Sequence, residues 1–247
     1  MRAAVISDIH SNLPALEAVL AAIDGSDAEI EEIWCLGDIV GYGAQPDECA
    51  GLVSERCEVI LAGNHDLAAL GELDISSFSA AAAEAVRWTM ESAAETTMEM
   101  LRALSPSGAR AGVGLFHASP RDPVWEYVLS VDQAAECMQL QSQRICLIGH
   151  SHVALYFVRE QGGEPLTHGA QAPDATSIDL AAQTWLVNPG SVGQPRDGDP
   201  RAAWLELDTD RLSAVFHRVA YEIEKAAAPI LESGLPRHLA DRLYAGQ

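Results

Sequence analysis

The sequence predicts an α/β protein in which buried parallel strands alternate with helices. Short apolar runs recur through the N-terminal part of the chain, and longer stretches with helical periodicity separate them. Runs that are apolar on both faces suit parallel strands covered by helices on each side. Polar residues directly follow these runs, at the positions where open α/β sheets bind their ligands.

The chain up to residue 153 contains five predicted strands, at residues 3–6, 33–36, 59–62, 113–116 and 146–148. The first helix is expected to begin after Asn12, whose short polar side chain is a good N-cap. Leu13, Leu16, Leu20 and Ile23 share one face of that helix. Further helices are predicted at about 47–54, 78–104 and 131–141.

Beyond residue 153 the pattern changes to short β-like runs separated by turn residues, at 155–158, 185–187, 203–207 and 214–216. We expect these runs to form a second, mainly antiparallel sheet. Residues 161–174 are rich in Gly, Pro and polar residues, so a surface loop or a mobile hairpin is expected. From Tyr221 onward the chain is predicted to be helical, with a break around Gly234 and Pro236. The chain shows no repeat or linker, and a single domain over 1–247 is expected.

The chain is strongly acidic, with 15 Lys and Arg against 36 Asp and Glu and a formal charge of −21. Such a surface repels polyanions, so we do not expect a broad nucleic-acid-binding surface. Hydrophobic residues make up 48% of the chain, which is enough for a sizeable core and excludes disorder throughout. A substrate that carries phosphate would need a local source of positive charge, and bound metal ions would supply it.

The cysteines predict a reducing environment. The five of them form no CxxC pair and no zinc-finger spacing, and several lie in apolar runs. Buried, inert thiols are the simplest interpretation. No apolar stretch approaches the roughly 20 residues that span a bilayer, and the start of the chain lacks a signal-peptide pattern. We therefore expect a cytoplasmic protein with no membrane partner.

Five polar clusters follow the predicted strands. Ligands of open α/β sheets bind outside the carboxyl ends of the strands, so we expect these clusters to meet in one crevice. A single cluster would be weak evidence, since a histidine at a strand end often only bonds to backbone. The occurrence of all five clusters in this order, each at a strand end, is strong evidence for one shared site. The clusters are Asp8-Ile9-His10, Gly37-Asp38, Gly63-Asn64-His65-Asp66, His117 and Gly149-His150-Ser151-His152.

Spacing and residue type within the clusters predict a metal site. Asp8 and His10, like His150 and His152, are two residues apart, so extended backbone would point both side chains of each pair to one pocket. The glycines before Asp38, Asn64 and His150 permit tight turns. Carboxylate, amide and imidazole donors without thiolate suit Mn, Fe, Zn or a related metal such as Ni, and not a structural zinc.

In this order, the motifs DxH, GD, GNHD, H and GHSH resemble those of the calcineurin-like metallophosphoesterase superfamily. The likeness is to its compact prokaryotic branch, and it extends through Asn188-Pro189-Gly190-Ser191-Val192-Gly193 to cover roughly residues 1–195. The resemblance implies an αββα four-layer sandwich of two packed mixed β-sheets flanked by helices. It also implies two divalent metal ions and the hydrolysis of a phosphoester.

The resemblance also implies a role for each motif residue. Asp38 would bridge the two ions, and a metal-bridging hydroxide would attack phosphorus in line, without a covalent enzyme intermediate. His65 resembles the family's non-ligand histidine, which contacts the phosphate or protonates the leaving oxygen. Asp66 would either orient His65 or make a purely structural hydrogen bond. The remaining ligands would be Asp8, His10 and His152 for one ion and Asn64, His117 and His150 for the other.

One departure from the family pattern bears on the substrate. Eukaryotic-type protein phosphatases carry an arginine after the bridging aspartate (GDxxDRG), whereas residues 37–43 here contain none. A phosphoprotein substrate is therefore not expected. Arg121 and Arg196 follow family-like motifs and are candidate phosphate contacts. A surface position is the simpler interpretation of each, with a salt bridge to Asp197 or Asp199 in the case of Arg196.

The function expected from these observations is the hydrolysis of a small phosphodiester or phosphomonoester. A diadenosine polyphosphate or pyrophosphate hydrolase is the enzymatic alternative. A non-catalytic protein-binding scaffold is a third possibility, which the complete ligand set disfavours. Trp125 and Tyr127, which follow His117, could line the substrate pocket, although packing is the simpler interpretation.

Overall fold

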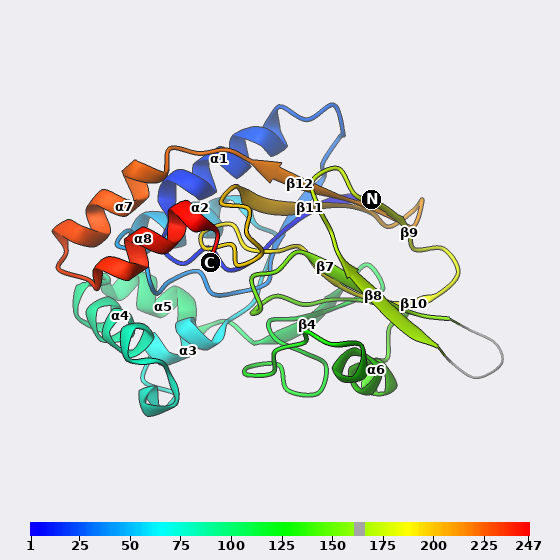
Figure 1. Cartoon of the computed structure of the whole chain (residues 1–247), viewed down its shortest axis with the longest axis horizontal. Helices are drawn as coiled ribbons and strands as arrows, with labels where there is room; N and C mark the ends of the chain where they lie inside the picture. The colour runs from blue at the N-terminus through cyan, green and yellow to red at the C-terminus, as the bar shows by residue number, and fades with distance from the viewer. Residues whose placement is uncertain (161–165) are drawn as a thin grey trace.

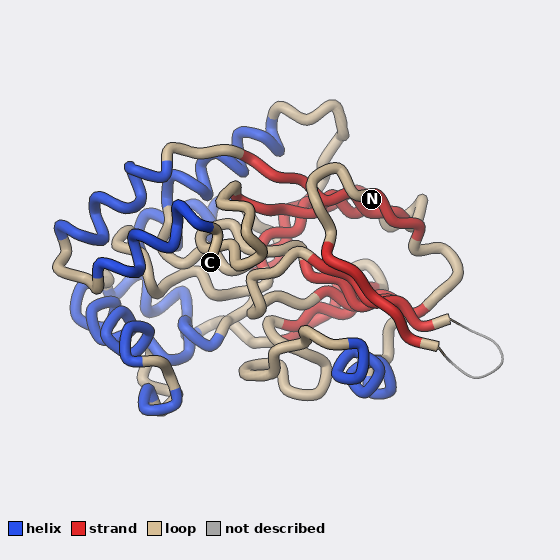
Figure 2. The backbone as a smooth tube through the Cα atoms, in the orientation of Figure 1, coloured by secondary structure: helices blue, strands red, loops and turns tan. Residues whose placement is uncertain are grey.

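Two six-stranded β-sheets lie face to face at the centre of the fold, and each mixes parallel and antiparallel pairs (Figure 1). The computed structural model describes residues 1–160 and 166–247, and the strand counts refer to these. Helices flank the pair of sheets, with α1 (Leu13–Asp24) on one side and α6 (Val131–Leu140) on the other. The tube view shows the same separation of helices and strands (Figure 2).

The first sheet has the order β3-β2-β1-β11-β12-β9. Strands β1, β2 and β3 run parallel, and β11 pairs antiparallel with β1. Their carboxyl ends therefore lie along one edge, where the polar loops follow. The strands are β1 (Arg2–Ile6), β2 (Glu32–Cys35), β3 (Val59–Ile60), β9 (Ser177–Asp179), β11 (Ala202–Asp208) and β12 (Ser213–Val219).

The second sheet has the order β4-β5-β6-β10-β7-β8. Strands β5, β6 and β10 are parallel, whereas β4, β7 and β8 pair antiparallel with their neighbours. The strands are β4 (Ser107–Arg110), β5 (Val113–Phe116), β6 (Ile145–Leu147), β7 (Leu155–Arg159), β8 (Thr167–Gln171) and β10 (Thr184–Asn188).

Alternation along the strands builds the core in layers. In β1, Val5 packs with Trp34 and Leu147 between the two sheets, whereas its neighbour Ile6 packs on the outer face with Leu16 of α1. Successive side chains of a strand point to opposite faces, so one strand serves both layers. On the far side, α6 covers the second sheet. The predicted αββα sandwich of two mixed sheets is confirmed.

The remaining helices extend the fold beyond the sheets. Both α7 and α8 pack on each other and against α4 through an apolar cluster that includes Ala85, Ile230 and Leu243. The helices are α2 (Pro46–Arg56), α3 (Asn64–Ala69), α4 (Ala80–Ser92), α5 (Glu95–Arg102), α7 (Ile223–Glu232) and α8 (Arg237–Ala245), with a 3-10 turn at Ile75–Ser77.

Several expected element boundaries are confirmed. Asn12 caps α1, since its Oδ1 accepts the N–H of Ala15 at 3.2 Å. The predicted break around Gly234 and Pro236 separates α7 from α8. The expectation of a single domain stays a prediction.

The expected long helix at 78–104 is wrong, because Ala93 and Ala94 are extended and divide it into α4 and α5. The Asp47 carboxylate of α2 accepts the N–H of Ala94 at 2.9 Å and the hydroxyl of Thr97 at 2.6 Å. A residue from another helix therefore supplies the acceptor at the start of α5, and no local signal announces it.

The expected separate antiparallel sheet after residue 153 is also wrong. Strands β7, β8 and β10 join the second sheet, while β9, β11 and β12 join the first. Of the expected 161–174 loop, residues 161–165 lie outside the described residues, and Thr167–Gln171 form β8. Local pattern identifies a strand but carries no information about its partner.

The cysteines are all free thiols; four are buried and Cys57 is half-buried. Burial raises the pKa of Cys57 to about 12 and that of Cys137 to about 11. The prediction of buried thiols is confirmed for four of them. Among the described residues, no helix is both long and apolar enough to cross a membrane. A cytoplasmic location stays a prediction.

Candidate metal centre

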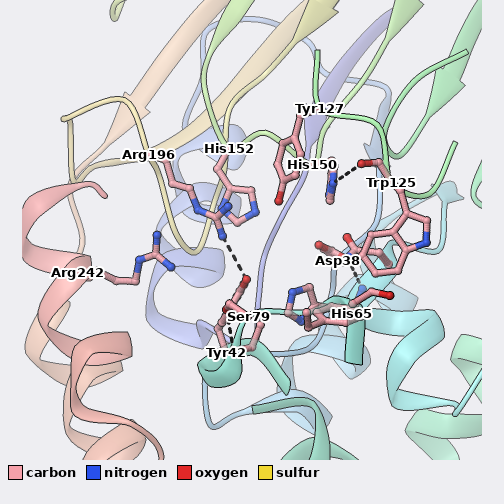
Figure 3. A pocket seen from close by; sticks show the side chains of 14 residues that line it. Asp38, Tyr42, His65, Ser79, Trp125, Tyr127, His150, His152, Arg196 and Arg242 are labelled. Carbon is pink, nitrogen blue, oxygen red and sulfur yellow. Dashed lines mark hydrogen bonds between the residues drawn. The ribbon is translucent and has the colours of Figure 1, made fainter. Parts of the chain in front are cut away.

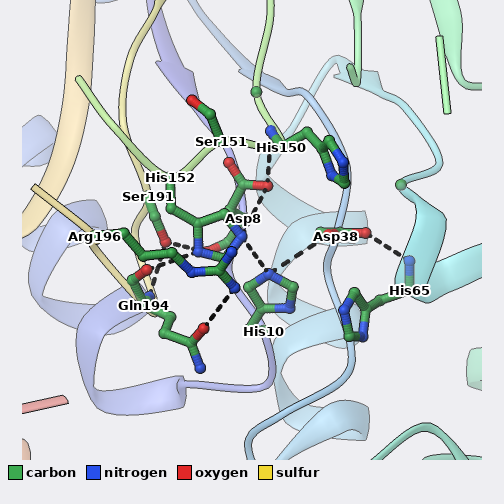
Figure 4. A network of polar contacts seen from close by, with 12 residues as sticks. Asp8, His10, Asp38, His65, His150, Ser151, His152, Ser191, Gln194 and Arg196 are labelled. Carbon is green, nitrogen blue, oxygen red and sulfur yellow. Dashed lines mark hydrogen bonds and ion pairs between the residues drawn. The ribbon is translucent and has the colours of Figure 1, made fainter. Parts of the chain in front are cut away.

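The five predicted loops meet at the carboxyl ends of β1, β2, β3, β5 and β6 (Figure 4). Backbone hydrogen bonds join the first two loops, from Asp8 N–H to the Gly37 carbonyl at 3.0 Å and from His10 N–H to the Asp38 carbonyl at 2.9 Å. The His150 N–H donates to Asp8 Oδ1 at 3.1 Å, which ties in the last loop. Side chains far apart in sequence are thereby held in one cluster.

The backbone of the site is left-handed at several ligand candidates. Asp8, His10, Asp38, His150 and His152 have φ angles of 55°, 50°, 54°, 63° and 59°. The expectation of extended backbone in the two alternate-spaced pairs is therefore wrong. Positive φ is unfavourable for residues with a side chain, and the loop hydrogen bonds hold the strained conformation. Such strain concentrates at functional sites.

Two glycines allow the loops to approach the acidic residues. A Cβ at Gly63 would lie 2.0 Å from Asp38 Oδ1, and a Cβ at Gly149 would lie 2.1 Å from Ser7 Oγ. No side chain fits at such distances. The backbone on which Asn64 and His150 follow can therefore pack directly against the acidic loops only because these positions are glycine.

Two groups of buried side chains present possible metal-binding atoms within 4.8 Å of one another. Asp38 belongs to both groups, and its Oδ2 lies 3.5 Å from His10 Nε2 and 3.6 Å from His117 Nε2. Asn64 Oδ1 lies 3.1 Å from His117 Nε2 and adds an amide oxygen to the second group. The groups are Asp8, His10, Asp38 and His152, and Asp38, His117 and His150.

The hydrogen bonds of the first group leave the Nε2 atom of each histidine ring without a hydrogen. His10 Nδ1 lies 3.1 Å from the Val40 carbonyl, and His152 Nδ1 lies 2.7 Å from the Gln194 carbonyl. A carbonyl only accepts, so each Nδ1 carries the hydrogen and each Nε2 of a neutral ring carries a lone pair. These two Nε2 atoms lie 3.0 Å apart. Two lone pairs at this distance repel each other, and a cation bound between them would relieve the repulsion.

The second group has the same arrangement. His117 Nδ1 lies 3.0 Å from the Leu36 carbonyl, so its Nε2 faces Asn64 Oδ1 as one acceptor faces another. His150 places Nε2 3.2 Å from the Trp125 carbonyl, so Nε2 carries the hydrogen and Nδ1 keeps a lone pair that a metal ion could accept. Carbonyls that fix the tautomer of a ring in this way are typical partners of metal-ligating histidines.

The buried carboxylates also lack partners. Asp8 Oδ2 and Asp38 Oδ2 are buried, and neither has a hydrogen-bond partner among the described residues. Burial raises the pKa of Asp8 to about 7 and that of Asp38 well above its ordinary range. Burial also lowers the pKa of His10 and His152 well below 6.5, so both rings are neutral at pH 7. Inward-facing oxygen and nitrogen lone pairs of this kind fit two divalent cations.

His65 lies beside this cluster and outside both metal-binding groups. Its ring contacts Tyr42 and Phe78, with centroids 4.3 Å and 5.1 Å away, and its Nδ1 is buried without a partner among the described residues. Burial, and then Arg196 and His117, lowers the pKa of His65 well below 6.5. A neutral ring at pH 7 has one N–H to donate into the adjoining pocket.

Asp66 has a different position from the one expected for an orienting residue. Its Oδ1 accepts the N–H groups of Ile39 and Val40 at 2.9 Å and 3.0 Å, and its Oδ2 accepts that of Gly63 at 2.8 Å. No hydrogen bond joins it to the His65 ring among the described residues. Burial raises the pKa of Asp66 to about 6. Of the two alternatives, the structure supports the structural hydrogen bond, because the carboxylate joins the second and third loops.

A cavity of about 320 Å³ adjoins the cluster and is lined by Asp38, Asn64, His65, His150 and His152 (Figure 3). Further lining comes from Trp125 and Tyr127, for which the sequence left both pocket lining and packing open, and from residues that sequence reasoning did not single out. Tyr127 stacks on His150 with centroids 4.1 Å apart, and Phe78 contacts Trp125 at 5.0 Å. These further residues are Tyr42, Phe78, Trp125, Tyr127 and Arg242.

The two predicted arginine contacts differ in position. Arg196 lines the cavity, and its Nη2 donates to Gln194 Oε1 at 2.8 Å. The alternative salt bridge of Arg196 to Asp197 or Asp199 does not form among the described residues. Arg121 pairs with Glu126 and Glu136, and it is not among the residues that line the cavity.

The chain is similar to known proteins over most or all of its length. Residues 1–210 match the model of the calcineurin-like phosphoesterase superfamily domain. An uncharacterised protein from Methanocaldococcus jannaschii is 37% identical over 251 residues, which cover 99% of this chain and 98% of the relative. The crystal structure of a metallophosphoesterase from Sphaerobacter thermophilus superposes with a TM-score of 0.86 at 39% identity, covering 100% of this chain and 99% of the other.

A hypothetical protein from Pyrococcus horikoshii has the same fold. Its crystal structure gives a TM-score of 0.79 at 21% identity and covers 100% of this chain and 98% of its own. Family model, related sequence and structural similarity all extend over most or all of the residues that build the cluster. The chain belongs to the calcineurin-like phosphoesterase superfamily.

Proposed function

We propose that this protein is a dinuclear-metal-dependent hydrolase of small phosphodiesters or phosphomonoesters. One observation carries the proposal: two groups of buried lone pairs share Asp38 and border a single cavity. Calcineurin-like phosphoesterases use a dinuclear divalent metal site. Each ion would be Mn, Fe, Zn or Ni. The first would be held by Asp8, His10, Asp38 and His152, and the second by Asp38, Asn64, His117 and His150.

The ligand set favours an anionic substrate. When bound, two divalent ions supply positive charge and activate water for attack on phosphorus. Asp8 and Asp38 are the only carboxylates proposed as ligands, so two divalent ions leave a positive excess. Asn64 contributes a neutral oxygen and preserves that excess. An anion can therefore enter this site although the chain has a formal charge of −21.

His65 is placed to act on the substrate itself. Its ring lines the cavity, while its backbone N–H donates to Asp38 Oδ1 at 2.8 Å and fixes the residue beside the carboxylate that both groups share. A neutral imidazole there donates an N–H to a phosphoryl oxygen. It serves as the general acid for the leaving oxygen once the negative substrate raises its pKa.

Arg196 is proposed as a cationic contact for the substrate. Its guanidinium lies over the Tyr42 ring, 5.7 Å from the centroid, and it borders the same cavity as Asp38 and His152. The stacking leaves the guanidinium edge available for oxygen acceptors. Arg196 thus occupies a position suited to the role that the missing GDxxDRG arginine has in the protein phosphatases.

Cavity size favours a small substrate over a dinucleoside polyphosphate. A volume of about 320 Å³ is at the lower end of ligand pockets. The contact between Phe78 and Trp125 lines one side of the cavity with aromatic rings, which suits an apolar or planar leaving group. A diadenosine polyphosphate would extend well outside it.

Hydrolysis assays test the proposal directly. Protein loaded with Mn²⁺ should hydrolyse p-nitrophenyl phosphate or its bis-ester, and a panel of cellular phosphoesters should then identify the substrate class. A diadenosine tetraphosphate in the panel tests the alternative, since preferred hydrolysis of that compound would replace the small-substrate proposal. Protein that binds two metal ions and hydrolyses no phosphoester in the panel would favour the non-catalytic scaffold.

A further inference from the structure

Two arginines from distant segments line the same cavity, Arg196 from the loop after β10 and Arg242 from α8 (Figure 3). Their environment is unusual in this acidic chain. Other arginines near the same loop are paired, as Arg201 is with Asp199 and Arg218 with Asp197. Among residues 1–160 and 166–247, no Asp or Glu side chain forms an ion pair with either cavity arginine.

The hydrogen bonds of these two arginines leave donors unused. Arg196 donates through Nη2 to Gln194 Oε1 at 2.8 Å and to the Tyr42 hydroxyl at 3.4 Å, and its Nε is buried without a partner in the described part of the chain. Arg242 donates through Nε to the carbonyl oxygen of Gln247. A guanidinium has five N–H donors, so most donors of the two side chains have no acceptor among the described residues.

Like charge makes this arrangement unfavourable without an anion. Burial, and then the neighbouring Arg196, lowers the pKa of Arg242. The carboxylates closest in sequence to Arg196 do not relieve the repulsion, since Arg218 and Arg201 engage Asp197 and Asp199. Two guanidiniums on one cavity are stabilised when an acceptor with negative charge binds to both.

The position of Arg242 is fixed by packing and by a backbone bond. Leu239 and Leu243 of α8 are buried against α7. At the end of the helix, the Gly198 N–H donates to the Gly246 carbonyl at 3.0 Å, which joins α8 to the loop that carries Arg196. Both α7 and α8 lie beyond residue 210, where the match to the family model ends. Arg242 therefore lies outside the residues that the family model matches.

We propose that Arg242 and Arg196 together form a second anion-binding site beside the metal centre. The preferred substrate then carries a second anionic group, phosphate or carboxylate, in addition to the phosphoryl group that is cleaved. This inference rests on the proposed function, because it places the cleaved group at the shared Asp38. It assigns Arg242 to substrate selection.

Binding of non-hydrolysable phosphonates tests the inference separately from catalysis. Butylphosphonate has one anionic group, and bisphosphonates and carboxyalkylphosphonates of three tether lengths have two. Isothermal titration of the Mn²⁺-loaded protein should show that at least one doubly anionic ligand binds about tenfold more tightly than butylphosphonate, as charge-assisted hydrogen bonds allow. If the bisphosphonates bind more tightly, the second anionic group of the substrate is a phosphate; if the carboxyalkylphosphonates do, it is a carboxylate.

Variants on α8 assign the effect to one residue. Arg242→Gln should remove most of the affinity advantage, whereas Arg242→Lys, which keeps the charge, should retain part of it. Arg237→Gln is the matched control on the same helix, since its side chain is 80% exposed and pairs with Asp241 away from the cavity. That control should leave the advantage unchanged.

Two results would overturn the inference. One is equal affinity for singly and doubly anionic ligands at every tether length. The other is an advantage that survives Arg242→Gln in protein whose thermal unfolding matches the parent. Either result, together with hydrolysis of p-nitrophenyl phosphate, would leave the proposed function standing, whereas absence of hydrolysis would count against the proposed function itself.

Discussion

His10 and His152 direct the Nε2 atoms of their rings toward each other at 3.0 Å, although both rings already use Nδ1 as a donor to a backbone carbonyl. Neutral rings with that tautomer cannot hydrogen-bond to each other through Nε2. Burial lowers the pKa of both rings well below 6.5, so both are neutral at pH 7. The pair is arranged for a cation, and the same reasoning holds for His117 and Asn64.

Replacing Asp38 should affect both proposed metal positions. Its Oδ2 lies within 3.6 Å of a histidine from each group, whereas Asp8 belongs to one group only. Asp38→Ala should therefore lose close to both equivalents of metal after dialysis, and Asp8→Ala close to one, by elemental analysis. Retention of both metals in Asp38→Ala would contradict the shared position.

Replacing His65 should separate catalysis from metal binding. The ring lies outside both metal-binding groups but lines the cavity. We expect His65→Ala to bind both metals and to lower kcat by roughly 10²–10⁴ if the ring is the general acid. A leaving group of low pKa, which needs no acid, should restore much of the rate. Loss of metal from this variant would show that His65 is a ligand.

The two arginines proposed from the sequence should behave differently on substitution. Arg196→Ala removes a cation that lines the cavity, so kcat/KM on the best substrate should fall about tenfold with metals retained. Arg121→Ala serves as its control, since that side chain pairs with Glu126 and Glu136. Equal kinetic effects of the two substitutions would remove Arg196 from the substrate contacts.

The thiols should be unreactive in the folded protein. A free thiol has a pKa near 8.5, and burial raises that of Cys57 and Cys146 to about 12. The thiolate fraction at pH 8 is therefore far smaller in the native state and grows only as the pH rises toward those values. We expect slow reaction with a disulfide reagent at pH 8 and rapid reaction of five thiols in guanidinium. Fast labelling of more than one thiol in the native protein would contradict the burial of Cys35, Cys49, Cys137 and Cys146.

The sequence predicts the parts of the site that depend on local pattern. Apolar runs end at Ile6 and Phe116, and the polar residues that follow, Asp8 and His117, lie in the cluster as expected. The carboxyl ends of parallel strands share an edge of the sheet, so the residue at which a strand ends is enough to place the next polar side chain at that edge. The N-cap role of Asn12 could be predicted for the same reason, because its hydrogen bond is to a residue in the first turn of the same helix.

Features set by distant contacts could not be predicted. The break at Ala93 depends on Asp47 from another helix. The left-handed backbone at Asp8 depends on a hydrogen bond to Gly37, whereas the sequence spacing alone favours an extended strand. Arg242 carries no motif, and only the packing of α8 brings it to the cavity. In each case the partner is distant in sequence and unmarked by pattern.

The most direct test of the account is a metal titration of chelator-stripped protein, followed by hydrolysis of bis-p-nitrophenyl phosphate. The seven proposed ligands form two groups that share Asp38, so hydrolysis should be absent in the stripped protein and should reach its full rate at two equivalents of Mn²⁺ or a neighbouring transition metal. Full activity of the stripped protein without added metal would contradict the account.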